Sequence, residues 1–178
     1  MAQKYEYTGK LSEGLIKVKA GVYPQYNCGY INTLGEEVIP LIYSGVKDFH
    51  EGLAVVRVGN WSTGKCGFIN ATGDVVVSFR YDKVMPFRNG IAKVKQDGEW
   101  FFIDLQENMV ISLRNYSGST YFYDGYAVVE IENYYGIINQ NGKEVVPCIF
   151  PACSAFNSIN RKHTVEFYLK NSYLNINR

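Results

Sequence analysis

The stretch that decides the fold runs from residue 51 to residue 87. It reads Glu-Gly-Leu-Ala-Val-Val (51–56), a polar tip, Lys-Cys-Gly-Phe-Ile-Asn (65–70), a Thr-Gly turn (72–73), Val-Val-Val-Ser-Phe-Arg-Tyr-Asp (75–82) and Met-Pro-Phe (85–87). Ala54, Val56 and Val58 alternate with polar Arg57, the period of two that is typical of a half-buried strand. The stretch therefore predicts three short strands followed by a corner.

The same order recurs along the chain, which makes this a repeat sequence. A Gly begins each copy, and successive Gly residues are 38, 38 and 35 positions apart: Gly14, Gly52, Gly90 and Gly125. The second strand of each copy reads Cys-Gly-Tyr-Ile-Asn (28–32), Cys-Gly-Phe-Ile-Asn (66–70), Trp-Phe-Phe-Ile-Asp (100–104) and Tyr-Gly-Ile-Ile-Asn (135–139). The predicted repeats cover about residues 14–49, 52–87, 90–122 and 125–156.

Two columns of the repeat have clear physical roles. The Ile of the second strand is expected to face the core, at Ile31, Ile69, Ile103 and Ile138. The next residue is always Asn or Asp, whose side chain can accept a hydrogen bond from the backbone two residues later and so begin a turn. We therefore interpret Asn32, Asn70, Asp104 and Asn139 as turn residues and not as catalytic or calcium-binding groups.

These residues resemble the bacterial WG-repeat (KWG) family. The resemblance is based on residues 51–56, 66–70, 72–73, 81–82 and 86–87, with further support from residues 97–100 and 141–147, and extends from about Tyr5 to Phe156. The naming Trp-Gly dipeptide occurs nowhere, because its Trp position holds Cys28, Cys66, Trp100 and Tyr135. The resemblance implies a single repeat domain over residues 1–178, a β-rich and mostly bacterial interaction module with few assigned activities.

The two ends of the chain look like parts of one further repeat. Residues 164–177 resemble a hairpin of the first and second strands, whereas residues 5–11 resemble the end of a preceding copy. A split unit of this kind would close a ring and cover its sheet edges. We therefore favour an all-β, propeller-like ring of about five units over an open β-solenoid. Proximity of residues 164–169 to residues 5–7 would decide between them.

Composition excludes several classes of function. The net charge is +1, and no basic stripe is present that could neutralise nucleic-acid phosphates. No apolar run approaches the roughly 18 residues of a membrane span. The first residues contain no apolar leader segment, so we expect a cytoplasmic protein without membrane insertion.

The cysteines and carboxylates do not suggest a reactive site. Cys28, Cys66, Cys148 and Cys153 occupy columns that are otherwise apolar or aromatic, so we expect them to be small buried hydrophobes. A zinc half-site at Cys148 and Cys153 lacks two further ligands, and a Cys28–Cys66 disulfide is not expected in a cytosolic setting. No pair of carboxylates has a spacing that favours acid–base catalysis. We therefore predict no enzyme activity, no metal and no cofactor.

Two hairpins are longer than the fold needs. The first and second strands are joined by longer connections in the first two copies, and these tips carry Tyr23, Tyr26 and Trp61. Tyr and Trp are common anchors of interfaces, and loops on a rigid scaffold often bind partners. The alternative is that these rings fold back over their own hairpins. We predict a non-catalytic protein-interaction or structural module; a carbohydrate- or cell-envelope-binding module is the second candidate.

Overall fold

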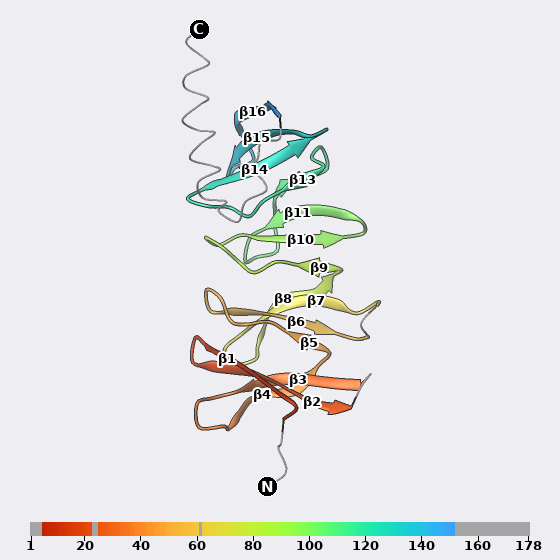
Figure 1. Cartoon of the computed structure of the whole chain (residues 1–178), viewed down its shortest axis with the longest axis vertical. Coiled ribbons are helices and arrows are strands. Elements are labelled where there is room, and N and C mark those ends of the chain that lie inside the picture. Colours follow the sequence, from red (N-terminus) through yellow and green to blue (C-terminus); the bar gives the residue numbers. More distant parts are fainter. Residues whose placement is uncertain (1–4, 23–24, 61, 152–178) are drawn as a thin grey trace. The chain divides into compact units, whose positions relative to one another are not determined.

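The structure is a computed structural model that describes residues 5–22, 25–60 and 62–151. These residues contain no helix and form four antiparallel four-stranded sheets, one after another along the chain (Figure 1). The prediction of an all-β chain of tandem repeats is confirmed. By its internal contacts the chain divides into two units. Unit 1 consists of the residues up to Gly98 together with Leu105–Glu107, and unit 2 consists of Glu99–Asp104 and the residues from Asn108 onward.

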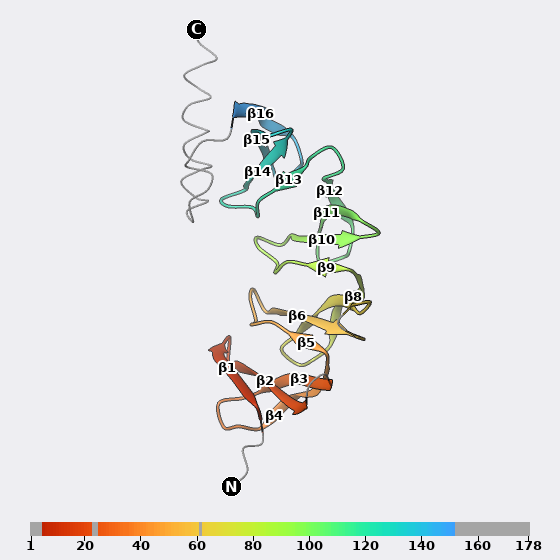
Figure 2. The same cartoon turned by 45° about the vertical axis from the view of Figure 1, so that its right-hand side comes forward.

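In each sheet the strands follow chain order, as Figures 1 and 2 show. The first sheet contains β1 (Tyr7–Ser12), β2 (Leu15–Val22), β3 (Gln25–Ile31) and β4 (Glu37–Tyr43). The second contains β5 (Gly45–Val46), β6 (Leu53–Val58), β7 (Lys65–Asn70) and β8 (Val75–Tyr81). The third contains β9 (Lys83–Val84), β10 (Ala92–Gln96), β11 (Glu99–Ile103) and β12 (Met109–Ser112). The fourth contains β13 (Gly118–Ser119), β14 (Tyr126–Ile131), β15 (Tyr134–Asn139) and β16 (Glu144–Pro151).

Each sheet has one strand more than the three predicted. The additional strand is short in the last three sheets and comes from residues just before the predicted corner, as in β5, where Gly45 and Val46 pair with Arg57 and Val56. In the first sheet the equivalent strand is β1, which pairs with β2. The end of one sequence repeat thus supplies the edge strand of the next sheet.

The residue pair that begins each repeat is a tight turn. Glu51 and Gly52 both have positive φ, 54° and 77°, and their neighbours His50 and Leu53 exchange backbone hydrogen bonds of 2.8 and 3.2 Å. This geometry is that of a two-residue type I′ turn, which suits an acidic or amide residue followed by Gly. The Gly column therefore lies in the turn before the first predicted strand of each repeat, which is β6 in the second sheet.

The acidic residues of these turns also connect successive repeats of unit 1. The Glu13 carboxylate accepts hydrogen bonds from the backbone N–H groups of Glu51 and Gly52, both at 2.9 Å. One turn later, Glu51 Oε1 accepts from the Asn89 N–H at 3.0 Å. A carboxylate in one turn therefore satisfies amide donors of the next.

The Asn and Asp column forms the predicted turns. Asn70 Oδ1 accepts from Thr72 N at 3.1 Å and from Asp74 N at 2.9 Å, and Asn32 and Asn139 bond the backbone two and four residues later in the same way. Asp104 accepts from Asn108 N at 2.9 Å. The prediction of turn chemistry is confirmed at these positions.

The core is larger than the alternation predicted. All four members of the Ile column are buried, as expected, but so is the residue before each of them: Tyr30, Phe68, Phe102 and Ile137. These residues point to the opposite face, because side chains alternate along a strand. In the second sheet Ala54, Val55 and Val56 are all buried, so this sheet has two apolar faces.

In unit 1 these two faces have different partners. Ala54, Val56 and Ile69 join one core cluster with residues of the first sheet and its corner: Leu15, Tyr30, Ile39, Tyr43 and Phe49. On the other face Phe68 packs edge-on against Phe87, with ring centroids 4.7 Å apart. A sheet covered on both sides does not need a polar face, which is why simple alternation underestimates its core.

A second glycine column marks a bulge. Between Cys66 and Phe68 the partner strand advances from Tyr81 to Val77, two residues more than β7 does, and the same shift occurs opposite Gly29 and Gly136. A Cβ on Gly67 would lie 2.8 Å from Ser78 O. The third sheet has Phe101 at this position, and there Phe101 and Phe102 pair with Ser112 and Ile111 without a bulge.

Several predicted features lie outside the described residues: the hairpin at residues 164–177, together with Phe156 and Cys153. The pairing of residues 164–169 with residues 5–7 therefore stays a prediction. No helix long and apolar enough to cross a membrane occurs in the described part of the chain.

Candidate functional site

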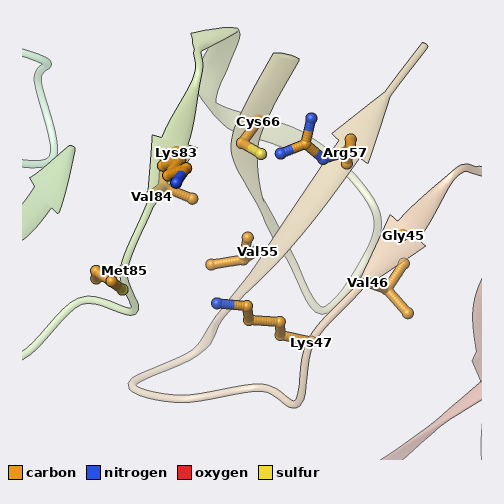
Figure 3. Close-up of a pocket in the computed structure, with 9 residues that line it drawn as sticks. All are labelled: Gly45, Val46, Lys47, Val55, Arg57, Cys66, Lys83, Val84 and Met85. Carbon is orange, nitrogen blue, oxygen red and sulfur yellow. The ribbon is translucent and has the colours of Figure 1, made fainter. Parts of the chain in front are cut away.

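The candidate site is a pocket in unit 1, on the face of the second sheet that carries Val55 and Phe68. Its volume is about 310 Å³. The apolar residues that line it are Val46, Val55, Val84 and Met85; the others are Gly45, Lys47, Arg57, Cys66 and Lys83 (Figure 3). They come from β5 and the residue after it, from β6 and β7, and from β9 and the residue after it. We call this site the unit-1 pocket.

Comparison with the first sheet explains why the pocket is open. The residues 38 positions before Val55 and Phe68 are Lys17 and Tyr30, which have longer side chains. The Lys17 ammonium reaches Asp48 at 3.0 Å, and the Tyr30 hydroxyl donates a 2.6 Å hydrogen bond to Lys47 O. Val55 lacks the long side chain of Lys17, and Phe68 lacks the hydroxyl group of Tyr30. The second sheet therefore leaves space on this face.

The pocket is lined by cations around an apolar centre. Arg57 donates hydrogen bonds to two backbone carbonyls, Gly64 O at 2.6 Å and Asp82 O at 3.2 Å, which fix the guanidinium against the sheet. Within the described residues, neither the Lys47 nor the Lys83 ammonium lies within 4.0 Å of a carboxylate oxygen. Figure 3 shows Val55 between the side chains of Arg57 and Lys47.

The carboxylate next to Lys83 is already engaged. Asp82 bonds the Lys65 ammonium at 2.5 Å and also accepts a hydrogen bond from Asp97 N at 3.1 Å. The bond from Lys65 holds the pKa of Asp82 below its usual value. The positive charge of the pocket is therefore not balanced by this neighbour.

Cys66 is the thiol of the pocket, and it is not activated. Burial raises its pKa, and the positive charges of Arg57 and Lys47 oppose this effect without reversing it. Reactive thiols have the opposite property, a lowered pKa in an electropositive and accessible place. Cys66 therefore belongs to the wall of the pocket.

The other described cysteines behave similarly. Cys28 and Cys66 are buried and free, which confirms the prediction that they pack as small hydrophobes without a disulfide between them. Cys148 is free and half-buried, and burial together with the charge of Glu144 raises its pKa to about 11. Among the described residues no cluster of three or more His, Cys, Asp or Glu side chains could hold a metal ion.

The structure places one of the three predicted binding residues. Tyr23 and Trp61 lie outside the described residues. Tyr26 lies half-buried near the end of the β2–β3 hairpin, and the Lys19 ammonium lies 3.1 Å from its ring centroid. This contact is a cation–π interaction, which covers one face of the ring. Tyr26 does not line the unit-1 pocket.

A separate polar cluster protects the edge of the second sheet. The Glu107 carboxylate accepts hydrogen bonds from Ser78 N, Ser78 Oγ and Tyr81 OH at 2.9, 2.8 and 3.1 Å, and pairs with Arg80 at 3.0 Å. Burial tends to raise the pKa of Glu107, but these hydrogen bonds and the charge of Arg80 outweigh burial and lower the pKa. The matching position of the first sheet is Pro40, a residue that cannot donate a ladder hydrogen bond. Both edge strands are therefore protected against pairing with another chain.

The unit-1 pocket was not predicted from the sequence, and the repeat alignment holds only a partial signal for it. Aligning the repeats shows a long polar side chain, Lys17 or Lys93, at the position where the second copy has Val55. The fourth copy has Val128 at this position, so a short apolar residue occurs in two of the four copies and does not by itself single out the second sheet. What forms the opposite wall could not be inferred, because β9 begins the next sheet.

Comparison with known families agrees with the repeat assignment. The family model described as WG containing repeat matches residues 29–60, 67–100, 100–135 and 135–158. The chain therefore belongs to the WG-repeat family, and the resemblance found in the sequence is confirmed. No curated protein matches the chain.

Proposed function

We propose that this chain is a non-catalytic module that binds a protein partner. The observation that supports this proposal is the unit-1 pocket, an apolar centre with three cations on its walls in a rigid antiparallel sheet. Binding sites often combine an apolar surface with a few placed polar groups.

A role without catalysis agrees with the chemistry of the nearby groups. The raised pKa of Cys66 makes it a poor nucleophile, and burial is the main cause. The carboxylates described above bond backbone amides or lysines, as Glu13 and Asp82 do. These groups stabilise turns and strands.

The test is affinity capture from cells of the source organism with the full chain as bait. The informative variant is Val55→Lys, which gives the second sheet the side chain that the first sheet has at Lys17. We expect it to lose the proteins that wild-type protein captures, provided that its circular dichroism spectrum is unchanged. Capture of the same proteins in the same amounts would exclude the unit-1 pocket as the binding site, and failure of the wild-type chain to capture any protein specifically would contradict the proposal.

The alternative, a carbohydrate- or cell-envelope-binding module, depends on the aromatic tips. Stacking on a sugar needs an open ring face, and the Lys19 ammonium covers one face of Tyr26. The triple variant Tyr23→Ala, Tyr26→Ala, Trp61→Ala separates the two functions. Loss of binding on a glycan array would favour the carbohydrate function, whereas a change confined to protein capture would assign the tips to the protein interface.

We also retain the closed ring of about five units as a proposal. It is supported by the open outer edge of β1, which has β2 as its one partner strand in the described sheet. Small-angle X-ray scattering tests it, because a compact chain of this length has a radius of gyration of about 16 Å. A clearly larger value would favour the open solenoid.

A bacterial source and a cytoplasmic location are part of the same proposal. The three described cysteines are free, and reduced thiols are typical of cytosolic proteins. A fusion to a fluorescent protein that folds only in a reducing compartment, expressed in the source cells, tests the location.

A further inference from the structure

We propose that the unit-1 pocket binds a segment of the partner protein in which a large apolar side chain is flanked by carboxylates. This inference depends on the proposed function and specifies the partner's chemistry.

The size of the pocket favours a side chain over a cofactor. Its volume, about 310 Å³, lies at the lower limit of typical ligand pockets, roughly 300–1,000 Å³. Val46, Val55 and Val84 lie on its walls, so a bare inorganic anion would leave an apolar surface in contact with water. An apolar side chain covers this surface and gains the free energy of its burial.

The charge of the walls favours carboxylates on both sides of that side chain. The Lys47 and Lys83 ammonium groups have no carboxylate within 4.0 Å among the described residues, and they come from different strands, next to β5 and in β9. Complementary charge on a partner increases specificity and the association rate. A partner segment with acidic residues on both sides of the apolar one can reach both lysines.

Binding by strand addition does not explain the site. The edge of β8 has its Ser78 N–H bonded to Glu107, and the edge of β4 carries Pro40. The partner segment is therefore recognised through its side chains, and its backbone does not extend the sheet.

The experiment measures fluorescence anisotropy of labelled, acetylated hexapeptide amides with the full chain. The first probe is Asp-Glu-Leu-Phe-Glu-Asp. In the second probe all four acids are replaced by their amides, and in the third Leu-Phe is replaced by Ala-Ala. We expect the first probe to bind at least tenfold more tightly than either of the others. Equal affinity for the amide probe would exclude the role of charge, and equal affinity for the Ala-Ala probe would exclude insertion.

Variants of the chain place the binding at the pocket. The double variant Lys47→Gln, Lys83→Gln should weaken the first probe about tenfold, because two exposed pairs contribute up to about fivefold each. Its matched control is Lys10→Gln, Lys143→Gln, which removes the same charge from exposed lysines outside the pocket and should not change the affinity. An equal loss in both double variants would overturn the assignment to this pocket.

Val55→Lys distinguishes insertion from attraction to a positive surface. It adds a positive charge, so attraction alone predicts tighter binding of the acidic probe, whereas a filled pocket predicts its loss. Val55→Met fills the same space without charge and should also abolish binding, which keeps the test valid if Val55→Lys does not fold. Wild-type affinity in Val55→Met would overturn the inference.

The outcomes separate this inference from the proposed function. If Val55→Lys loses the captured proteins while Lys47→Gln, Lys83→Gln retains them, the module binds a partner here and the acidic chemistry is wrong. If Val55→Lys retains them, the partner binds outside the unit-1 pocket and this inference is wrong; if the wild-type chain captures no protein specifically, the proposed function itself is wrong.

Discussion

The first and second sheets have the same backbone framework, and they differ in the contacts made by the side chains on one face. In both, an aromatic residue of the third strand packs edge-on against the phenylalanine of the following corner: Tyr30 on Phe49 at 4.9 Å, and Phe68 on Phe87 at 4.7 Å. In the first sheet Lys17 and Tyr30 extend to polar partners, whereas Val55 and Phe68 leave the unit-1 pocket. A repeat can therefore acquire a site by losing side-chain volume, with its backbone unchanged.

The largest expected effect tests what the two sheets share. Phe68→Ala should reduce the free energy of unfolding by about 3–5 kcal/mol, because a fully buried aromatic ring and its contact with Phe87 are lost. Chemical denaturation monitored by circular dichroism measures it. Val75→Ala, a substitution of an exposed residue of the same sheet, should cost less than about 0.5 kcal/mol. Similar losses in the two variants would show that the ring is not part of the core.

The next effect concerns the bulge that both sheets contain. Gly67→Ala should cost about 1–3 kcal/mol, because the new Cβ would lie 2.8 Å from the Ser78 carbonyl oxygen and the backbone must move. Gly29→Ala should reduce the free energy of unfolding by a similar amount. The matched control is Gly118→Ala, whose Cβ would lie 2.9 Å from Oε2 at the far end of the flexible Glu130 side chain and which should cost less than about 0.5 kcal/mol. If Gly67→Ala is as stable as the control, the bulge does not require glycine.

A smaller effect tests the difference between the sheets. Tyr30→Phe gives the first sheet the ring of the second and removes the 2.6 Å hydrogen bond to Lys47 O, at a cost of about 1 kcal/mol. The exposed Tyr7→Phe is the control and should leave the unfolding midpoint in urea unchanged. No loss on Tyr30→Phe would mean that the hydroxyl does not stabilise the filled arrangement.

The smallest effect depends on pH and on the two edge strands. Glu107 has a lowered folded pKa, so it stabilises the second sheet above its unfolded pKa of about 4.3, and this contribution is lost as pH falls through the lower folded value. Glu107→Gln should cost about 0.5–1 kcal/mol at pH 7, and the difference from wild type should shrink below pH 4. Urea unfolding at pH 7 and pH 3.5 measures both. An exposed carboxylate of the first sheet, removed in Glu37→Gln, is the control; an equal pH dependence there would contradict this role of Glu107.

Local chemistry made much of the fold predictable. The turns at Asn32, Asn70 and Asn139 and the Ile column depend on neighbours in the sequence, and the structure confirms both. Burial of Val55 and Val128 was not predictable from alternation, because it depends on packing against residues far along the chain. The bulge next to Gly67 and the unit-1 pocket were not predictable for the same reason. Each depends on which other strand packs beside the residue, and the sequence does not show that pairing.

The candidate site was less predictable than the fold. Aromatic residues at hairpin tips suggested Tyr23, Tyr26 and Trp61, whereas the unit-1 pocket is formed by residues that look ordinary in the sequence. Lys47 and Lys83 are distinguished from the other lysines by lining the pocket together with Val55 and Val84. Which side chains share a pocket is a property of the three-dimensional structure, and one sequence does not reveal it.

The bonds from Glu13 to the turn at Glu51, and from Glu51 to Asn89, have a consequence for how this chain can change in length. They set the distance between consecutive turns, so an added residue there would separate acceptor from donor. The opposite hairpin ends have no such constraint; Asn60 stabilises its own tip through Ser62 and Thr63. Insertions that diversify recognition should therefore accumulate at one margin of the repeats, while the other margin keeps their spacing.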